Sequence, residues 1–261
     1  MNLAPRHTLL LDVVRAHGPQ TIESLAERFG VTLQTVRRDV QRLADAGLLS
    51  RFHGGVRLPG STTENIAYRQ RQAMESEAKA RIARAIAQRV PNGCSLILNI
   101  GTTIEAVAHE LLRHQGLRVI TNNLHIAALL STNPDCEVIV AGGVVRAADQ
   151  GIVGEATVDF MRQFKVDIGL IGISGIEADG TLRDFDYREV KVARTIIGQS
   201  REVWLAADHS KFHRAAMVEL ARLDEVDVLF TDATPPPPFA ELMAQGGVEC
   251  VVAGQADATA D

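Results

Sequence analysis

The sequence predicts a winged helix-turn-helix domain at the N-terminus, followed by a Rossmann-like α/β domain. Two short amphipathic helical patterns joined by a tight turn, with a glycine hairpin signal after them, predict the first domain. Apolar strand patterns that alternate with helical patterns from residue 95 onward predict the second, in which a mainly parallel sheet is covered on both faces. The length of 261 residues is too great for a winged helix alone.

Two helical patterns open the first domain. Residues 5–17 form the first expected helix. Residues 22–29 form the second, which Thr21 caps at its start and Gly30 ends. The apolar positions expected to face the domain core are Leu9, Leu10, Val13, Val14, Ile22, Leu25, Ala26 and Phe29.

A third helix is expected over residues 33–46, after the N-cap Thr32, and its two faces differ. The opposite face from its apolar stripe carries arginine and glutamine side chains, which can fork onto guanine and adenine edges or reach phosphates. For this helix taken alone, an ordinary solvated face is the alternative. The expected apolar stripe consists of Leu33, Val36, Val40 and Leu43.

A basic hairpin follows this helix. Gly54-Gly55 separates two short alternating runs, so a hairpin is expected there as the wing. Residues 1–60 carry eight arginines against five acidic residues, a balance of +3, so the remainder carries −8 of the net charge of −5. A basic head on an acidic body suits a protein whose head binds double-stranded DNA. The residues expected to contact DNA are Thr21, Thr32, Gln34, Thr35, Arg37, Arg38, Gln41, Arg42, Arg51, His53 and Arg57.

Composition shifts set the expected domain boundaries. We expect the winged-helix domain over residues 1–59, a linker and connecting helix over 60–92, and the α/β domain over 93–254. Residues 255–261 are rich in Ala and Asp and are expected to be disordered. In α/β sheets, small ligands bind beyond the carboxyl ends of the strands, where this chain collects small and polar residues. The expected strands are residues 96–100, 117–120, 137–141, 167–172, 202–206, 226–231 and 247–251.

A ligand site is expected among the loops that follow these strands. Gly101-Thr102-Thr103 opens a helix directly after a strand, where free backbone N–H groups and two hydroxyls suit a phosphate, although an ordinary strand-to-helix turn has the same pattern. Lys211 is one of only four lysines and follows another strand, so it is either a phosphate partner or a surface lysine. The expected effector-binding residues are Gly101, Thr102, Thr103, Asn122, Asn123, Gly142, Gly143, Ser174, Gly175 and Lys211.

Other classes of function receive less support. Asp184, Asp186 and Glu189 offer a general base for catalysis, but they would equally cap the helix that starts near Asp186. The histidines and cysteines show no metal-ligand spacing, so no metal and no cofactor is expected. Without a signal peptide or a membrane-spanning apolar run, we expect a cytoplasmic protein. The cysteines expected to be reduced and buried are Cys94, Cys136 and Cys250.

Over nearly its whole length the chain resembles the DeoR family of transcriptional regulators. The resemblance implies a body similar in fold to ribose-5-phosphate isomerase, a dimeric or tetrameric repressor, and release from operator DNA by a phosphorylated sugar or polyol. The protein is then not expected to be an enzyme. The segments that carry the resemblance are residues 34–39, 51–55, 99–103, 121–123, 141–143, 151–154 and 208–212.

Residues 101–109, 172–176 and 185–190 resemble the subgroup of this family that controls glycerol 3-phosphate metabolism, which implies glycerol 3-phosphate as effector. Asn99 departs from the pattern, because many members have an acid two residues before the Gly-Thr-Thr loop. If that acid serves isomerase-like chemistry, its loss favours sensing without turnover. If it contacts a ligand hydroxyl, Asn99 still does so as donor or acceptor.

Two alternatives stay open at this point. One is a sugar-phosphate isomerase with a DNA-binding appendage, which product formation by the isolated body would reveal. The other is an activator, or a repressor that needs its ligand as co-repressor, which a promoter-binding assay with and without ligand would distinguish.

Overall fold

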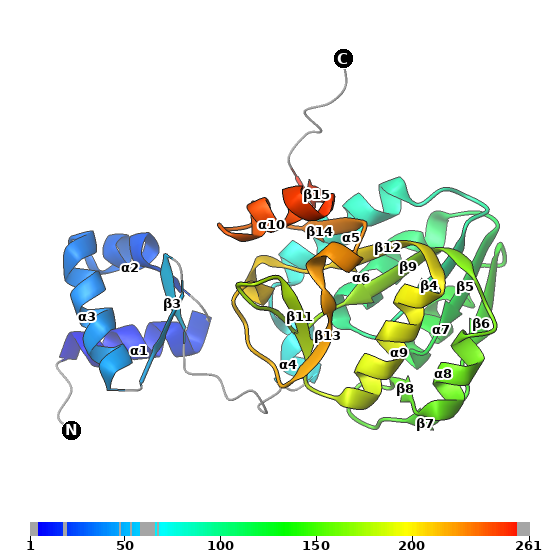
Figure 1. Ribbon diagram of the computed structural model, residues 1–261, viewed down its shortest axis with the longest axis horizontal. Coiled ribbons are helices and arrows are strands. Elements are labelled where there is room, and N and C mark those ends of the chain that lie inside the picture. The colour runs from blue at the N-terminus through cyan, green and yellow to red at the C-terminus, as the bar shows by residue number, and fades with distance from the viewer. Residues whose placement is uncertain are drawn as a thin grey trace, which may run out of the picture. The chain divides into compact units, whose positions relative to one another are not determined.

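The computed structural model divides the chain into two compact units, residues 1–62 and 63–261 (Figure 1). The expected domain boundary at residue 59 and the expected disordered tail lie outside the described residues. The structure describes residues 5–17, 20–46, 48–52, 54–57, 66 and 68–254.

The first unit is a winged helix, as predicted. Its strands pair antiparallel in the order β1-β3-β2, so the hairpin after the third helix forms the wing. The Oγ1 atom of Thr21 accepts a hydrogen bond from the N–H of Ser24 at 3.0 Å, and Gly30 ends α2 in the left-handed conformation with φ 62°. The elements are α1 (Pro5–His17), β1 (Gln20–Thr21), α2 (Ile22–Phe29), α3 (Leu33–Asp45), β2 (Ser50–Phe52) and β3 (Gly55–Arg57).

Two predicted core positions of this unit are wrong. Leu9 is 56% exposed, and its place in the core is taken by Leu11. Leu33 is 41% exposed because it is the first residue of α3, where a side chain points back beyond the packed part of the helix. The core cluster comprises Leu10, Leu11, Val14, Ile22, Leu25, Ala26, Val36, Val40, Leu43, Leu49 and Val56.

The second unit contains a seven-stranded sheet in the order β15-β14-β12-β9-β4-β5-β6. Every neighbouring pair in it is parallel, which confirms the predicted Rossmann-like α/β class. The order reverses between β4 and β9, which are neighbours although other strands separate them in the chain. The strands are β4 (Ser95–Leu98), β5 (Leu117–Thr121), β6 (Cys136–Val140), β9 (Val166–Gly172), β12 (Ser200–Ala206), β14 (Val228–Thr231) and β15 (Glu249–Val252).

Helices cover both faces of this sheet (Figure 1). Strand β4 shows the alternation that this requires, because Leu96 and Leu98 join one core cluster and Ile97 joins the other. The cluster that contains Leu96 and Leu98 includes residues of α5 (Ser76–Arg89), α6 (Thr102–Glu110) and α7 (Leu124–Leu130). The cluster that contains Ile97 includes residues of α8 (Glu155–Met161), α9 (Tyr187–Gly198) and α10 (Phe239–Gly246).

The segment predicted as a connecting helix takes a different form in the structure. The helical pattern before the first strand forms two helices, α4 (Tyr68–Ala73) and α5, separated by Glu75 in the left-handed conformation with φ 51°. Ile82 and Ile86 of α5 are fully buried in the core on one face of the sheet. Because the apolar stripe of α5 packs on this sheet, the helix belongs to the second unit rather than to a linker.

A small antiparallel sheet and a hairpin were not predicted. Strands β10 (Gly175–Ile176), β11 (Thr181–Asp184) and β13 (Val218–Arg222) form the sheet in the order β10-β11-β13. Strands β7 (Val144–Val145) and β8 (Ile152–Val153) form the hairpin. The small sheet matters for function because the end of β11 brings an acidic side chain to the carboxyl ends of the main strands.

The cysteines have free thiols, as predicted. Cys94 and Cys136 are buried, whereas Cys250 is half-buried. Burial raises the pKa of the Cys94 thiol to about 11, which keeps it protonated at neutral pH.

Candidate functional site

The polar face of α3 is presented to solvent, as a DNA-reading helix requires. Thr35 is half-buried instead, and its N–H donates to the Oγ1 atom of the N-cap Thr32 at 3.3 Å. His53 and the side chain of Arg57 lie outside the described part of the chain. The predicted DNA-contacting residues with exposed side chains are Thr21, Thr32, Gln34, Arg37, Arg38, Gln41, Arg42 and Arg51.

The wing and α3 form one connected polar surface. The guanidinium of Arg51 on β2 donates a hydrogen bond to the side-chain oxygen of Gln41 on α3. The side-chain nitrogen of Gln41 donates to Asp45 at 2.6 Å. Gln41 is therefore held in place from both sides before any DNA arrives.

Asp39 is a buried acid in α3 that the sequence reading missed. It is 3% exposed and ties α3 to α1, because Nε of Arg6 donates to its Oδ2 at 2.6 Å and Nε2 of His7 lies 3.1 Å from its Oδ1. Burial acts to raise the pKa of this carboxyl, but the hydrogen bonds from Arg6 and His7 outweigh it and hold the pKa below its ordinary value.

Replacing Asp39 with asparagine is expected to destabilise the winged-helix unit by about 1–3 kcal/mol, since hydrogen bonds to a charged group are lost. Because the folded pKa is lowered, the stabilising contribution of Asp39 is present above about pH 4 and is lost as the pH falls through the folded pKa. Amide hydrogen exchange in α1 and α3, measured at about pH 6 and about pH 3, checks this acid dependence. Glu27→Gln on α2 is the control; equal acid sensitivity of Asp39→Asn and wild type would contradict the prediction.

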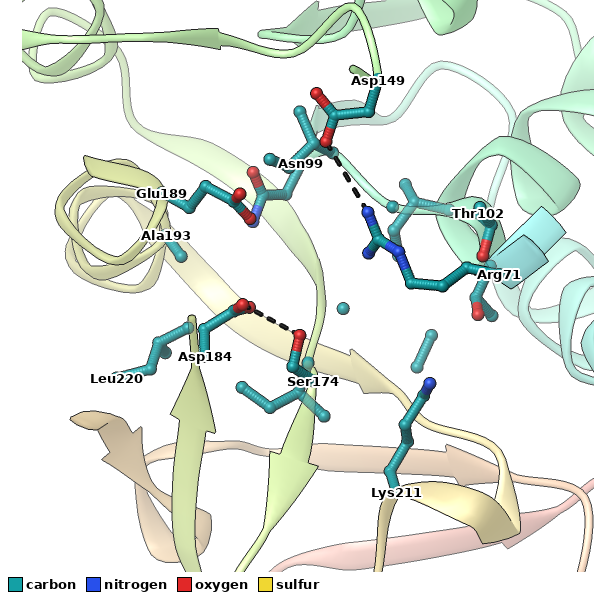
Figure 2. A pocket seen from close by; sticks show the side chains of 17 residues that line it. Arg71, Asn99, Thr102, Asp149, Ser174, Asp184, Glu189, Ala193, Lys211 and Leu220 are labelled. Atoms are coloured by element: carbon teal, nitrogen blue, oxygen red, sulfur yellow. Dashed lines mark hydrogen bonds and ion pairs between the residues drawn. The ribbon is translucent and has the colours of Figure 1, made fainter. Parts of the chain in front are cut away.

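A cavity in the second unit lies where the strand order reverses, beyond the carboxyl ends of β4 and β9 (Figure 2). This is the place where open α/β sheets bind small ligands. The residues that line it are Arg71, Asn99, Ile100, Gly101, Thr102, Thr103, Ile104, Asp149, Gly172, Ile173, Ser174, Asp184, Glu189, Ala193, Ala206, Lys211 and Leu220.

Half of the predicted effector residues meet at this cavity. Gly101, with φ 137°, is the N-cap of α6, so the first free N–H groups of that helix follow it. Thr102 and Thr103 form the first turn of α6. Ser174 follows β9, and Lys211 ends the short 3-10 turn His209–Lys211 after β12.

The two predicted asparagines do not line the cavity. The side-chain oxygen of Asn123 caps α7 by accepting from the N–H of His125 at 2.8 Å, and its amide nitrogen donates to Glu105 at 3.0 Å. The amide nitrogen of Asn122 donates to the carbonyl of Ile152 at 3.0 Å. Both side chains hold loops together instead of facing the cavity.

The three predicted glycines outside the Gly-Thr-Thr loop also lie away from the cavity lining. The carbonyl of Gly142 accepts from the hydroxyl of Thr157 at 2.9 Å, and a Cβ on Gly143 would lie 2.2 Å from that same hydroxyl oxygen. A Cβ on Gly175 would lie 2.1 Å from the carbonyl oxygen of Arg214. These glycines are needed for close packing of the chain on itself.

Charged side chains of both signs line the cavity, and Asp149 lies beside Arg71 (Figure 2). Arg71 and Lys211 lie on one side, and Asp184 and Glu189 on the other. Burial lowers the pKa of Lys211, although the carboxylate of Asp208, 3.7 Å from its Nζ, acts in the opposite direction. Burial raises the pKa of Asp184, whose Oδ1 accepts a hydrogen bond from Ser174 at 2.9 Å. A ligand with an anionic end and a hydroxyl-bearing end fits this separation.

Two polar atoms at this cavity are buried without a hydrogen-bond partner among the described residues: Oδ1 of Asn99 and Nε of Arg71. Asn99 is only 4% exposed. A buried polar atom without a partner is costly, which makes these two atoms candidate contacts for a ligand.

Sequence reasoning missed Arg71, and it did not assign Asp184 and Glu189 to this site. Nothing in the sequence pattern marks Arg71 as a site residue, because it lies in the segment that was predicted to connect the two domains. Asp186, weighed with those two acids, caps α9 by accepting from the N–H of Arg188 at 2.9 Å. The capping alternative is therefore confirmed for Asp186.

Family models match both units. The model of the DeoR-like helix-turn-helix domain matches residues 6–62, and that of the DeoR C-terminal sensor domain matches residues 74–233. The chain belongs to the DeoR family. The predicted resemblance is thus confirmed, and the sensor-domain match includes α5, in agreement with its place in the second unit.

Three relatives that match over nearly the whole chain are named as repressors. The glycerol-3-phosphate regulon repressor of Escherichia coli K12 is 48% identical over 236 residues, which are 90% of this chain and 93% of that protein. The repressor of the same name from Haemophilus influenzae is 47% identical and covers 90% of this chain and 91% of its own length. The transcriptional repressor CsqR of Escherichia coli is 39% identical over 95% of both chains.

Solved structures that match have low sequence identity. A chain of the tetrameric eIF2B-β2-δ2 complex from C. thermophilum matches with a TM-score of 0.50 and 12% identity, covering 92% of this chain and 86% of that one. Ribose 5-phosphate isomerase A from Methanocaldococcus jannaschii matches with a TM-score of 0.40 and 14% identity, covering 53% and 55%. The likeness to the eIF2B chain concerns the fold alone.

The rest of the described chain offers neither a membrane span nor a metal centre. Within the residues that the structure describes, no helix is both long and apolar enough to cross a membrane. In the same part of the chain, no three His, Cys, Asp or Glu side chains gather in a way that could hold a metal ion.

Proposed function

We propose that the protein represses a carbon-catabolic operon by binding double-stranded operator DNA through α3 and the wing, and that a phosphorylated polyol or sugar releases it. The observation that carries this proposal is the cavity at the point of strand reversal, with Arg71 and Lys211 on one side and Asp184 and Glu189 on the other. The exposed basic face of α3 supplies the DNA-binding half.

The charged walls orient the proposed effector. Its phosphate would bind Lys211 and the first turn of α6, because an ammonium and free helical N–H groups are donors that phosphates prefer. Its hydroxyls would face Ser174 and Asp184 on the other wall, where carboxylate oxygens accept hydrogen bonds. No cofactor is needed for this binding.

Glycerol 3-phosphate is the effector we propose. The relatives named as glycerol-3-phosphate regulon repressors support this choice, since they match 90% of this chain. Because helix-turn-helix proteins commonly read two half-sites as symmetric dimers, we also propose a homodimer or a tetramer, acting in the cytoplasm.

Isothermal titration calorimetry is expected to show binding of glycerol 3-phosphate and no comparable binding of glycerol, since the phosphate supplies the charged contacts. The same ligand should release a labelled operator fragment. Release by a pentose or hexose phosphate at far lower concentration would overturn the effector assignment. Turnover of ribose 5-phosphate by the protein would favour the isomerase alternative, and tighter operator binding with ligand would favour a co-repressor.

A further inference from the structure

Helix α4 contributes Arg71 to the lining of the ligand cavity and is held at its first residue by the α/β body. The hydroxyl of Tyr68 donates a hydrogen bond to Oε2 of Glu105 on α6 at 2.7 Å. The ring of Tyr68 also stacks on the ring of His125 on α7, with ring centroids 5.8 Å apart and planes 7° from parallel. These contacts fix one end of α4 beside α6, the helix whose N-terminus opens the cavity.

A buried lysine holds the other end of α4. Lys79 on α5 is 5% exposed, and its ammonium donates hydrogen bonds to the backbone carbonyls of Arg71 and Met74, the latter at 2.6 Å. Because α5 is packed in the core on the sheet, the last turn of α4 is anchored to a rigid part of the unit.

Between these anchors, the side chain of Arg71 reaches into the cavity (Figure 2). Its one ion pair among the described residues is with Asp149, and the two charged atoms are 3.8 Å apart, beyond hydrogen-bond distance. Its buried Nε has no hydrogen-bond partner in the described structure. A guanidinium has five donors in a planar fork, so Arg71 retains donors for an oxyanion.

We propose that Arg71 on α4 binds the effector's phosphate, and that this phosphate replaces Asp149 as the partner of the guanidinium and thereby strengthens the attachment of α4 at the cavity. This inference rests on the proposed function. Helix α4 is the first helix of the second unit, directly after the segment that leads from the DNA-binding unit. An effector that binds Arg71 therefore acts on the helix at which the second unit begins. Regulation requires that the effector bind the DNA-free state more tightly than the DNA-bound state, and a contact supplied by α4 is a means to that difference in affinity.

The test compares Arg71→Met with Arg118→Met in the full-length protein, using glycerol 3-phosphate as the probe. Arg118 is exposed on β5 and pairs with Glu137 outside the cavity, so its loss controls for charge and composition. Arg71→Met is expected to weaken calorimetric binding by about tenfold or more, since a charge-assisted contact is lost. Arg118→Met is expected to bind as wild type does.

Hydrogen exchange of the α4 amides supplies a second readout. Exchange there should slow when wild type or Arg118→Met binds the probe, and should not slow in Arg71→Met at equal occupancy. If wild type binds the probe and releases operator, but the two variants match it in affinity and in α4 exchange, the role of Arg71 is wrong and the proposed function stands. If wild type neither binds the probe nor releases operator, the proposed function itself fails.

Tyr68→Phe tests the link to DNA binding separately, because it removes the bond to Glu105 without altering the cavity lining. We expect effector affinity within about twofold of wild type but a smaller maximum fraction of operator released, because coupling and binding are distinct free energies. Full release by Tyr68→Phe at the wild-type effector concentration would show that the anchorage of α4 does not transmit the signal.

Discussion

Replacing Lys211 with methionine is expected to abolish the response to glycerol 3-phosphate while leaving operator binding intact. Among the described residues that line the cavity, Lys211 is the one lysine, and burial means that a ligand phosphate would meet its ammonium with little screening by water. An effector regulates only through its different affinity for two states, so losing its main charged contact removes the coupling. Operator release, measured by fluorescence anisotropy against effector concentration, checks the result.

Lys191→Met is the matched control, because Lys191 is exposed and pairs with Glu155 away from the cavity. Lys211→Met also leaves Asp208 without its nearby cation, so thermal unfolding should accompany the titrations. Lys211→Arg keeps the charge and should retain a partial response. Wild-type effector affinity in a folded Lys211→Met protein would remove Lys211 from the proposed site.

Replacing Arg38 with alanine is expected to weaken operator binding by about 1–3 kcal/mol per half-site if its guanidinium forks onto a guanine, and to relax sequence preference there. If Arg38 contacts only phosphate, affinity should fall equally on every sequence and the salt dependence should become shallower. Anisotropy titrations of operator and unrelated DNA over a series of salt concentrations distinguish the two results.

The control for Arg38→Ala is Arg28→Ala, since Arg28 is an exposed arginine of the same unit on α2, outside the predicted DNA-contacting set. Both variants should keep their response to the effector in the second unit. Unchanged binding by Arg38→Ala at every salt concentration would show that this arginine is merely solvated.

Periodicity predicted the winged helix because α2 and α3 are short, amphipathic and capped by the side chains of Thr21 and Thr32. It failed for Asp39, which occupies a buried position next to Val40 and is tolerated only because Arg6 and His7 lie beside it. Those partners are far away in sequence and belong to another helix. A pattern within one helix does not reveal them.

The cavity was predictable to the extent that a parallel sheet gathers its strand ends at one edge. This rule brought Gly101, Ser174 and Lys211 together correctly. The same rule also placed Asn123 in the site, although this residue caps α7. A polar residue after a strand has the same sequence pattern whether it caps the next helix or binds a ligand. Arg71 could not be found this way, since it reaches the cavity from a helix that precedes the first strand.

The winged-helix unit has a hydrophobic core of its own, formed by residues between Leu10 and Val56. The winged-helix unit should therefore be exchangeable between related regulators, which makes hybrid regulators feasible. Joining this second unit to the winged-helix domain of another DeoR regulator, with α4 kept in the second unit, should yield a repressor that binds the operator of the other regulator. That repressor should respond to the effector of this protein. In such a chimera, the expression of a reporter gene would show which metabolite the cavity binds.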